Sequence, residues 1–310
     1  VGGGLSLYMK KQVRTITEGS MMLAIIGLFL FLNLQFAGIL QTYFIIFIPL
    51  PILIYTIRYG FKSGLVVSFG AVFLSIMLGN IITLFYIGGG LLVGLAYGYG
   101  VNSNKSNDWL LFVSTLINAI SLFVETYVLA AFIGYDLYKD TEALIESLKG
   151  IEGLVLPDNF MAQVLAITPI ILLLTGFLQA LMTHLLSVTL LKRLNIVVRK
   201  MKPLQHIQLP KWLGFIALLG LFSSTILYQS GDQNLQIVAS LILFVSALII
   251  IGDAFILIAI YGKRTNRKYL PTFAMLALIL LPTVLIYGFI GLGLLDCFTD
   301  IRKRIELITL

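Results

Sequence analysis

The chain has 310 residues, of which 59% are hydrophobic and only 11% charged, and its mean hydropathy is +1.02. Soluble domains carry about 25% charged residues, so this chain lacks the polar side chains needed to cover a surface in water. The composition excludes a soluble domain and predicts an integral membrane protein. Because the apolar runs are continuous and do not alternate with polar residues, we expect an all-α polytopic helical bundle of about eight to ten spans.

The net charge of +7 is distributed unevenly when the chain is cut at its apolar runs. One side holds Lys10, Lys11, Arg14, Arg58, Lys62, Lys105, Lys192, Arg193, Arg199, Lys200, Lys202, Lys211, Lys263, Arg264, Arg267 and Lys268. The other side holds only Lys139 and Lys149. This asymmetry is the positive-inside pattern and predicts a cytoplasmic N-terminus. The excess of cations therefore reflects topology, and we expect no binding of nucleic acid.

The cysteine content and the N-terminus narrow the class further. Cys297 is the single cysteine, which excludes an intrachain disulfide and a cysteine-based metal cluster. Residues 1–8 precede Met9 and are expected to be a leader or a remnant of an upstream start. The first apolar run lacks a small-x-small cleavage site, so we expect it to remain as a span.

The first two spans carry distinct local signals. Span one is expected from about Thr17 to Ala37, with Thr17 as its cap and Glu18 at the positive end of the helix dipole. Span two, at about residues 43–57, contains Pro49 and Pro51. Two prolines remove amide donors and clash with the preceding turn, so this span is predicted to be kinked or broken.

The stretch from Leu65 to Gly100 carries no charge and is too long for one span. We therefore predict a division near Gly79 and Asn80. After that division three glycines follow at a strict spacing of four, namely Gly90, Gly94 and Gly98. Small residues at this spacing predict the close approach of another helix.

A polar stripe marks the apolar run between Trp109 and Ile133. Its members fall at i, i+4, i+7 and i+11, and are Ser114, Asn118, Ser121 and Glu125. On a helix they share one face. A carboxylate inside a membrane costs about 3 kcal/mol, so Glu125 is expected to face a partner, a proton path or a wet cavity. The alternative is a carboxyl group kept neutral by burial and hydrogen-bonded to Asn118 or to a neighbouring hydroxyl.

The longest predicted outer segment runs from Gly134 to Phe160 and is acidic. Asp140 or Thr141 can cap a short helix that ends at Gly150. Its apolar face is expected to contain Leu144, Leu148 and Ile151. The helix, at 140–151, is interpreted either as a lid over the bundle or as an ordinary interfacial helix.

Span six is expected at about 161–191 and carries further polar residues. Gln179 and Thr183 share one face, and His184 lies beside it. His184 has two interpretations, a ligand contact or a hydrogen bond between packed helices. The basic segment 192–211 that follows has an apolar stripe, which suits either a helix on the inner leaflet or a linker with no role beyond topology.

The C-terminal part contains spans seven and eight, at about 212–229 and 235–261. Span eight carries Asp253 near its middle, and the sequence does not decide between a structural and a functional role for it. The last apolar stretch, 270–295, is interrupted by Pro282. It forms either a single span or a hairpin.

The motifs of common enzyme classes are absent from the sequence. No HExxH pair exists, because the two histidines are His184 and His206, and no GxxxxGK[ST] or GxSxG motif occurs. We therefore expect no enzyme, no catalytic residue, no cofactor and no metal site.

Four motifs together resemble the YybS-like family of bacterial membrane proteins. They are Thr17-Glu18-Gly19, Pro49-Leu50-Pro51, Arg58-Tyr59-Gly60-Phe61-Lys62-Ser63-Gly64 and the segment from Asp296 to Arg304. The N-terminal part of that family is similar to the substrate-binding (S) components of energy-coupling-factor vitamin transporters. Those six-helix proteins capture a vitamin or a metal from outside and dock on a shared ATP-driven module.

The resemblance implies an organisation of the chain. An S-component-like six-helix domain is expected over 9–191, a basic cytoplasmic linker over 192–211, and additional membrane helices over 212–310. The small-x-x-x-small docking motif of the first S-component helix falls on Ser20 and Ala24. The additional helices depart from the S-component pattern, and they could occupy the docking face.

The preferred hypothesis is a solute-binding protein of S-component type in the bacterial cell membrane. The expected ligand-binding residues are Glu125, Asn118, Ser121, Gln179 and His184. A cationic or amine-bearing solute suits a lone carboxylate best, and the lipid bilayer and an ATP-driven coupling module are the other expected partners. The alternatives are a non-transporting scaffold or regulator that binds a protein partner, and a proton-coupled carrier that works through Glu125 and Asp253.

Overall fold

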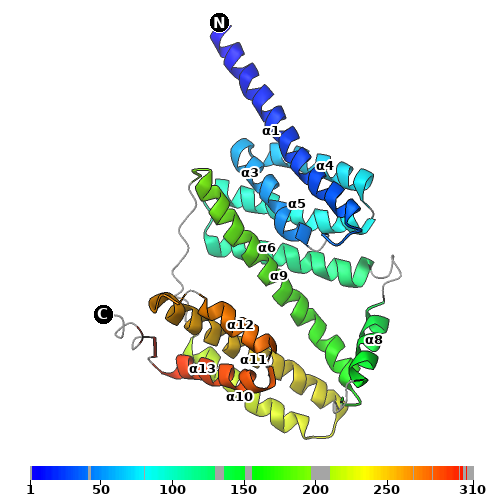
Figure 1. The fold of residues 1–310 in the computed structure, drawn as a ribbon, viewed down its shortest axis with the longest axis vertical. Helices are drawn as coiled ribbons and strands as arrows, with labels where there is room; N and C mark the ends of the chain where they lie inside the picture. The colour runs from blue at the N-terminus through cyan, green and yellow to red at the C-terminus, as the bar shows by residue number, and fades with distance from the viewer. Residues whose placement is uncertain are drawn as a thin grey trace. The chain divides into compact units, whose positions relative to one another are not determined.

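The fold is a bundle of apolar helices in a computed structural model (Figure 1). The structure describes residues 2–40, 43–79, 81–129, 136–150, 156–196, 210–267, 269–280, 282–299, 301–302 and 305. Within these ranges 7 helices are long and apolar enough to cross a membrane, and two shorter apolar helices cover Phe44–Tyr59 and Leu285–Phe298. The predicted all-α polytopic membrane bundle is confirmed.

The chain divides into two compact units. The first unit contains Val1–Ala143 and Thr168–Lys200, and the second contains Leu144–Ile167 and Met201–Leu310. The sequence suggested one N-terminal domain over 9–191, whereas the structure groups residues 144–167 with the C-terminal helices. This grouping matters for the site, because the latter part of helix α9 (Phe160–Arg193) lies in the first unit.

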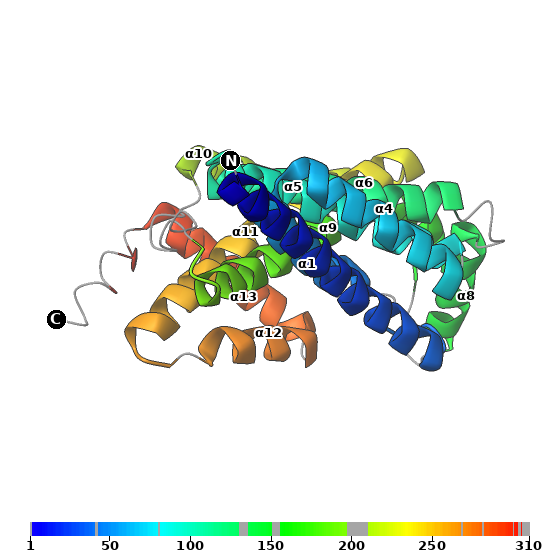
Figure 2. The same cartoon turned by 90° about the horizontal axis from the view of Figure 1, so that it is seen from above.

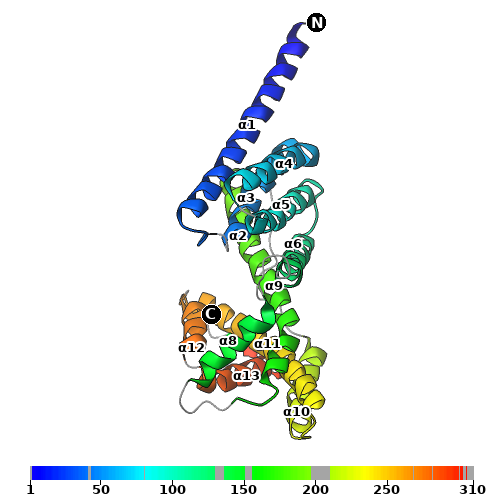
Figure 3. The same cartoon turned by 90° about the vertical axis from the view of Figure 1, so that its right-hand side faces the viewer.

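Helix α5 is the central helix of the first unit. It packs against α2, α3, α4 and α6, while α1 lies against α3 and α4 (Figure 3). The bounds of these helices are α1 (Gly2–Gln35), α2 (Phe44–Phe47), α3 (Pro49–Tyr59), α4 (Phe61–Leu78), α5 (Ile81–Asn102) and α6 (Asn107–Phe123). The hydrophobic core includes Ile26, Leu30, Phe44, Ile52, Leu53 and Leu110.

Helix α1 does not begin where the sequence suggested. It starts at Gly2, and the Thr17 hydroxyl donates to the carbonyl of Val13 at 2.9 Å, so Thr17 lies inside the helix and the predicted cap is wrong. In the polar turn before the apolar run, Arg14 and Glu18 form an i,i+4 ion pair at 2.9 Å, an arrangement that favours a helix. Glu18 also pairs with Arg58 at the end of α3, at 3.0 Å.

Both predicted breaks in the apolar runs are confirmed. Helix α2 ends before Ile48, and α3 begins at Pro49, where a residue without an amide donor suits the first helical turn. Helix α4 ends at Leu78, and Gly79 is extended with φ −130° and ψ −158°. A Cβ atom on Gly79 would lie 2.7 Å from the carbonyl oxygen of Ser75, so the bend has no room for a side chain.

The three evenly spaced glycines of α5 form its contact with α3, as predicted. A Cβ atom on Gly94 would lie 2.8 Å from the Pro49 carbonyl oxygen and 2.8 Å from the Ile52 Cβ. A Cβ on Gly98 would lie 2.6 Å from the Thr56 Cβ. The two backbones therefore approach too closely for any larger residue on this ridge.

The second unit contains helices α10 (Lys211–Tyr228), α11 (Gln233–Arg264), α12 (Leu270–Leu280) and α13 (Pro282–Phe298). Helices α10 and α11 pack together through small residues, with Gly220 against Ser246. Helix α13 turns back after α12, as Figures 1 and 2 show. Of the two alternatives for the last apolar stretch, the structure therefore has the hairpin, with residue 281 outside the described residues.

A buried ion cluster joins α11, α13 and the segment after α13. Arg302 Nη2 lies 2.9 Å from Asp253 Oδ1 and 2.5 Å from Asp296 Oδ2. The two carboxylate side chains are only 1% and 0% exposed, and the Arg302 side chain is 10% exposed. The role that the sequence left open for Asp253 is, in the structure, that of an ion-pair partner.

The α3–α5 contact predicts a sharp difference between two glycines of the same helix. We expect Gly94→Ala to destabilise the fold by about 1–3 kcal/mol, because the added methyl group overpacks the contact with α3. Gly88→Ala is the matched control, since nothing lies within 4 Å of its Cβ position. Thermal unfolding in lipid nanodiscs checks this, and equal melting temperatures for the two variants would contradict the proposed contact.

The ion cluster predicts that Arg302→Met destabilises the fold by about 3–5 kcal/mol, because it removes the cation that contacts both buried carboxylates, Asp253 and Asp296. Arg267→Met is the control, since Arg267 is exposed. Adding Asp253→Asn to Arg302→Met is expected to restore part of the lost stability. Thermal unfolding of the three variants measures these effects, and an unchanged Arg302→Met protein would show that the cluster contributes nothing.

Candidate functional site

The polar stripe of α6 faces neighbouring helices. Ser114 and Asn118 are 1% and 0% exposed. The Asn118 side-chain amide donates to the carbonyl of Gly176 on α9 at 3.5 Å. Ser121 lies against α5, because a Cβ on Gly89 would be 2.7 Å from the Ser121 hydroxyl oxygen. Periodicity alone therefore identified the protein-facing side of this helix.

Glu125 lies on a π-helical turn, Val124–Leu129, that follows α6. Its carboxylate is half-buried and accepts a hydrogen bond from Tyr86 of α5. Because a π-turn rotates the following residues relative to an α-helix, the regular stripe does not continue unchanged to this position. Glu125 thus lies beside α5, and its hydrogen bond to the Tyr86 hydroxyl is the contact with a neighbouring hydroxyl that the alternative interpretation described.

Helix α9 crosses α6 at a glycine. A Cβ on Gly176 would lie 2.8 Å from the backbone nitrogen of Ala119, so the two backbones touch here. Ala180, Thr183 and Ser187 continue the same buried stripe along α9, and each is 0% exposed. The buried stripe of α9 is therefore made of small residues, two of them polar.

His184 lies next to this stripe and contacts α5. Its Nδ1 shares a hydrogen bond with the Tyr97 hydroxyl at 2.9 Å, and both residues are 1% exposed. This is the helix-to-helix hydrogen bond that the sequence offered as one interpretation of His184. Tyr97 was missed, because no sequence periodicity connects the glycine-rich α5 with a histidine on α9.

Six polar atoms on α6 and α9 have no hydrogen-bond partner among the described residues. They are Ser114 Oγ, Asn118 Oδ1, Gln179 Oε1, Thr183 Oγ1, His184 Nε2 and Ser187 Oγ, and we call them the α6–α9 polar cluster. All six are shielded from solvent. A buried polar atom left unpaired costs about 1–3 kcal/mol, so the cluster requires an explanation.

Other hydroxyls on the same two helices are satisfied. Thr115, Thr175 and Thr189 each donate to the carbonyl four residues earlier at 2.8 Å. The hydroxyls of Thr183, Ser114 and Ser187 make no such bond in the structure. Among the described residues of the first unit, Asn33 Oδ1 and Thr56 Oγ1 are also buried and unpaired, so the unpaired state is not confined to α6 and α9.

The cluster extends along a substantial part of α9. From the crossing at Gly176 to the Tyr97 contact at His184, an α-helix rises about 12 Å. This distance is comparable with the length of a small organic molecule. Its hydroxyl, amide and imidazole atoms are hydrogen-bonding groups.

The predicted docking residues lie on the surface of their unit. Ser20 and Ala24 are exposed on α1, as are Met21 and Leu28 at 52% and 58%. An exposed small-residue position on an apolar helix is accessible to lipid or to another helix. The docking role stays a prediction.

The predicted lid helix is present but begins earlier. Helix α8 spans Leu137–Lys149, and Asp136 caps it by accepting from the backbone nitrogen of Tyr138 at 3.0 Å. The prediction of Asp140 or Thr141 as the cap is wrong, because the Thr141 hydroxyl instead donates to the Leu137 carbonyl. Ile151 and most of the basic linker, residues 197–209 with His206, lie outside the described residues.

Comparison with known proteins gives a family and no known activity. The model of a family described as "Predicted membrane protein (DUF2232)" matches residues 24–297. The chain is similar to the "Uncharacterized protein YybS" of Bacillus subtilis (strain 168), at 22% identity over 317 residues, which covers 96% of this chain and 100% of that protein. No solved structure matches the chain. The chain thus belongs to the DUF2232 family of membrane proteins, and it is a YybS-like member.

Proposed function

We propose that this protein binds a small polar solute between α5, α6 and α9, as a non-enzymatic solute-binding component of a membrane transport system. The α6–α9 polar cluster is the observation that carries the proposal. The protein is proposed to lie in the bacterial cell membrane with its N-terminus in the cytoplasm, as the distribution of cations predicts.

A solute explains the unpaired atoms better than helix packing does. Helices that pack only for stability gain nothing from a hydroxyl without a partner, because in an apolar medium such a group is costly. The satisfied hydroxyls of Thr175 and Thr189 show that α9 can pair a threonine with its own backbone. Leaving Thr183 unpaired between two helices is consistent with a partner that comes from outside the chain.

The chemistry of the cluster defines the class of solute. Asn118 and Gln179 offer carbonyl oxygens as acceptors, the three hydroxyls can donate and accept, and His184 offers Nε2. If the Tyr97 hydroxyl donates to Nδ1, then Nε2 carries a proton and is itself a donor. This mixture suits an uncharged molecule rich in both donors and acceptors.

Glu125 and Ser121 lie one to two turns beyond Asn118 along the same helix, next to α5. We propose that they extend the polar surface of the binding region. In this arrangement the carboxylate of Glu125 contacts an amine group if the solute carries one. The preference for a cationic solute therefore depends on Glu125 alone and not on the main cluster.

Coupling to an ATP-driven module is part of the proposal. Its support is the exposed position of Ser20 and Ala24 on α1, where small residues allow a partner helix to approach. The competing function is a scaffold that binds another protein and no solute.

The solute hypothesis predicts different behaviour of two threonines on α9. Thr183→Val removes an unpaired buried hydroxyl without changing the shape of the side chain, and Thr189→Val removes an exposed hydroxyl that is already bonded to its own helix. We expect Thr183→Val to reduce the amount of a copurifying small molecule about fivefold or more, as expected for one lost hydrogen bond of about 1 kcal/mol. Thr189→Val should leave that amount unchanged.

Untargeted mass spectrometry of extracts from purified protein in nanodiscs measures this amount. The melting temperature of the solute-free protein provides a second readout. We expect Thr183→Val to unfold at the same or a higher temperature than the original protein, because an unsatisfied group has been removed. A lower melting temperature, with no copurifying molecule in any sample, would show that the cluster serves packing.

The docking hypothesis predicts the effect of a larger side chain on α1. We expect Ala24→Leu to abolish copurification of an ATPase and a transmembrane coupling subunit from native membranes, since it blocks close helix approach. Leu28→Phe, at an exposed apolar position of the same helix, is the control. Recovery of a different stable partner, unaffected by Ala24→Leu, would favour the scaffold function.

A further inference from the structure

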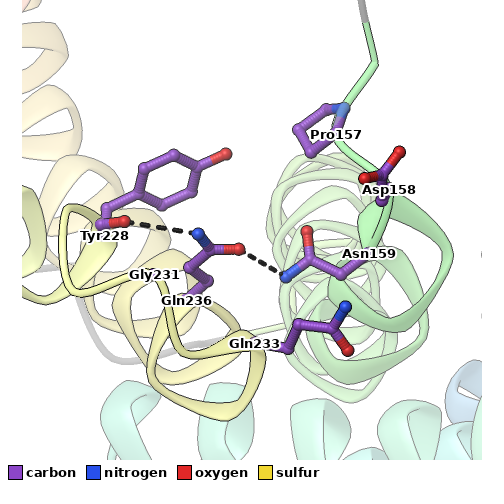
Figure 4. Close-up of a pocket in the computed structure, with 7 residues that line it drawn as sticks. All are labelled: Pro157, Asp158, Asn159, Tyr228, Gly231, Gln233 and Gln236. Carbon is purple, nitrogen blue, oxygen red and sulfur yellow. Dashed lines mark hydrogen bonds between the residues drawn. The ribbon is translucent and has the colours of Figure 1, made fainter.

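A polar hollow lies within the second unit, separate from the α6–α9 polar cluster. It has a volume of about 260 Å³ and is lined by Pro157, Asp158, Asn159, Tyr228, Gly231, Gln233 and Gln236 (Figure 4). These residues belong to the start of α9, the end of α10 and the start of α11. Because all three helices are long and apolar enough to cross a membrane, the hollow is expected at the boundary between hydrocarbon and water.

The floor of the hollow is a chain of hydrogen-bonded side-chain amides. Gln163 donates to Asn159 at 2.9 Å, and Asn159 donates to Gln236 at 2.9 Å. Gln236 in turn donates to the carbonyl of Tyr228 at 3.4 Å. Gln163 and Asn159 are each 8% exposed. The chain fixes the orientation of each amide, so the remaining lone pairs of their carbonyl oxygens keep fixed directions.

A carboxylate and an aromatic ring stand on either side of this floor. In Figure 4, Tyr228 lies on one side of the Asn159–Gln236 pair, and Asp158 lies on the other. None of the described residues that line the hollow carries a positive charge. Carboxylate and carbonyl oxygens beside an aromatic face are the groups that bind an ammonium ion.

The electrostatic field at the hollow also favours a cation. Helices α9 and α11 both begin here, and each helix N-terminus carries roughly half a positive charge. Against these stand the full negative charges of Asp158 and of Asp232, which caps α11 by accepting from the backbone nitrogen of Asn234 at 2.8 Å. Two carboxylates outweigh two partial charges, so the sum is negative.

We propose that this hollow binds the ammonium group of a small polar amine, with Asp158 as its counter-ion, Tyr228 as its aromatic wall and the Asn159–Gln236 pair as its floor. A water molecule in the liquid occupies about 30 Å³, so the hollow has room for roughly eight or nine waters. A small amine with a few heavy atoms fits in this space. Two sources present this chemistry at a membrane surface, a free amino solute and the head group of phosphatidylethanolamine. The inference is independent of the proposed solute site in the first unit.

The test uses the full chain in nanodiscs of phosphatidylcholine, with 2-aminoethanol as the probe and thermal unfolding as the readout. We expect a saturable rise in melting temperature with 2-aminoethanol and none with sodium chloride at equal ionic strength. Asp158→Asn should raise the half-saturation concentration of 2-aminoethanol about tenfold or more, because it removes the charged partner of the ammonium group. Glu142→Gln, on the exposed surface of α8, is the matched control and should titrate like the original protein.

A second variant and a second lipid complete the experiment. Tyr228→Leu removes the aromatic wall and should also weaken 2-aminoethanol binding, so the proposal stays testable if Asp158→Asn does not fold. If the lipid is the source, phosphatidylethanolamine nanodiscs raise the melting temperature without added probe and suppress its effect. If a free solute is the source, the probe acts equally in both lipids. An unchanged titration for both variants, or an equal response to sodium chloride, would overturn the proposal.

Discussion

The close contact of α3 with α5 is the constraint on which the first unit depends. Lipid is as apolar as a leucine side chain, so membrane helices gain little by burying apolar surface and depend on close packing. The ridge from Gly90 to Gly98 provides that packing and fixes α5 at the centre of the unit. Helix α5 then presents Tyr97 to His184 and Tyr86 to Glu125. The geometry of the candidate site thus follows from three glycines on another face of the helix.

Two groups of charged side chains in the described residues form ion pairs between segments that are distant in the sequence. Glu18 connects α1 to Arg58 at the end of α3, and Arg302 connects Asp253 of α11 to Asp296 of α13. All of these residues except Asp253 belong to the motifs that suggested the family. These motifs are therefore explained as helix-to-helix contacts, which preserve a fold. The residues of the α6–α9 polar cluster lie outside these motifs.

Local rules predicted the local features of the fold well. The breaks at Pro49 and Gly79 follow from a missing amide donor and from a bend without space for a side chain, and both can be inferred from the sequence. The start of α1 could not be inferred, because the helix continues to Gly2 through a polar segment that precedes the apolar run. The cap of α8 was misplaced for a similar reason, since several acidic residues compete as caps and only the backbone selects Asp136.

Contacts between distant helices were predicted only in part. Periodicity identified which face of α6 is polar, but not that Glu125 lies on a π-turn. The pairing of His184 with Tyr97 required the register of α9 against α5, which a single sequence does not contain. The ion pair of Asp253 with Arg302 depends on the turn after α13 that brings the arginine back to α11. The hydrogen-bond and ion-pair partners of these residues are therefore known only from the tertiary structure.

The free-energy cost of leaving buried polar atoms unpaired bears on the role of the α6–α9 polar cluster. Six unpaired groups at about 1–3 kcal/mol each amount to a penalty on the order of 10 kcal/mol, which is comparable with the whole stability of a typical domain. The amides at the start of α9 and α11 satisfy one another and form a rigid surface without any ligand. The atoms of the α6–α9 polar cluster, by contrast, have no such partners among the described residues, and water or another molecule can supply them.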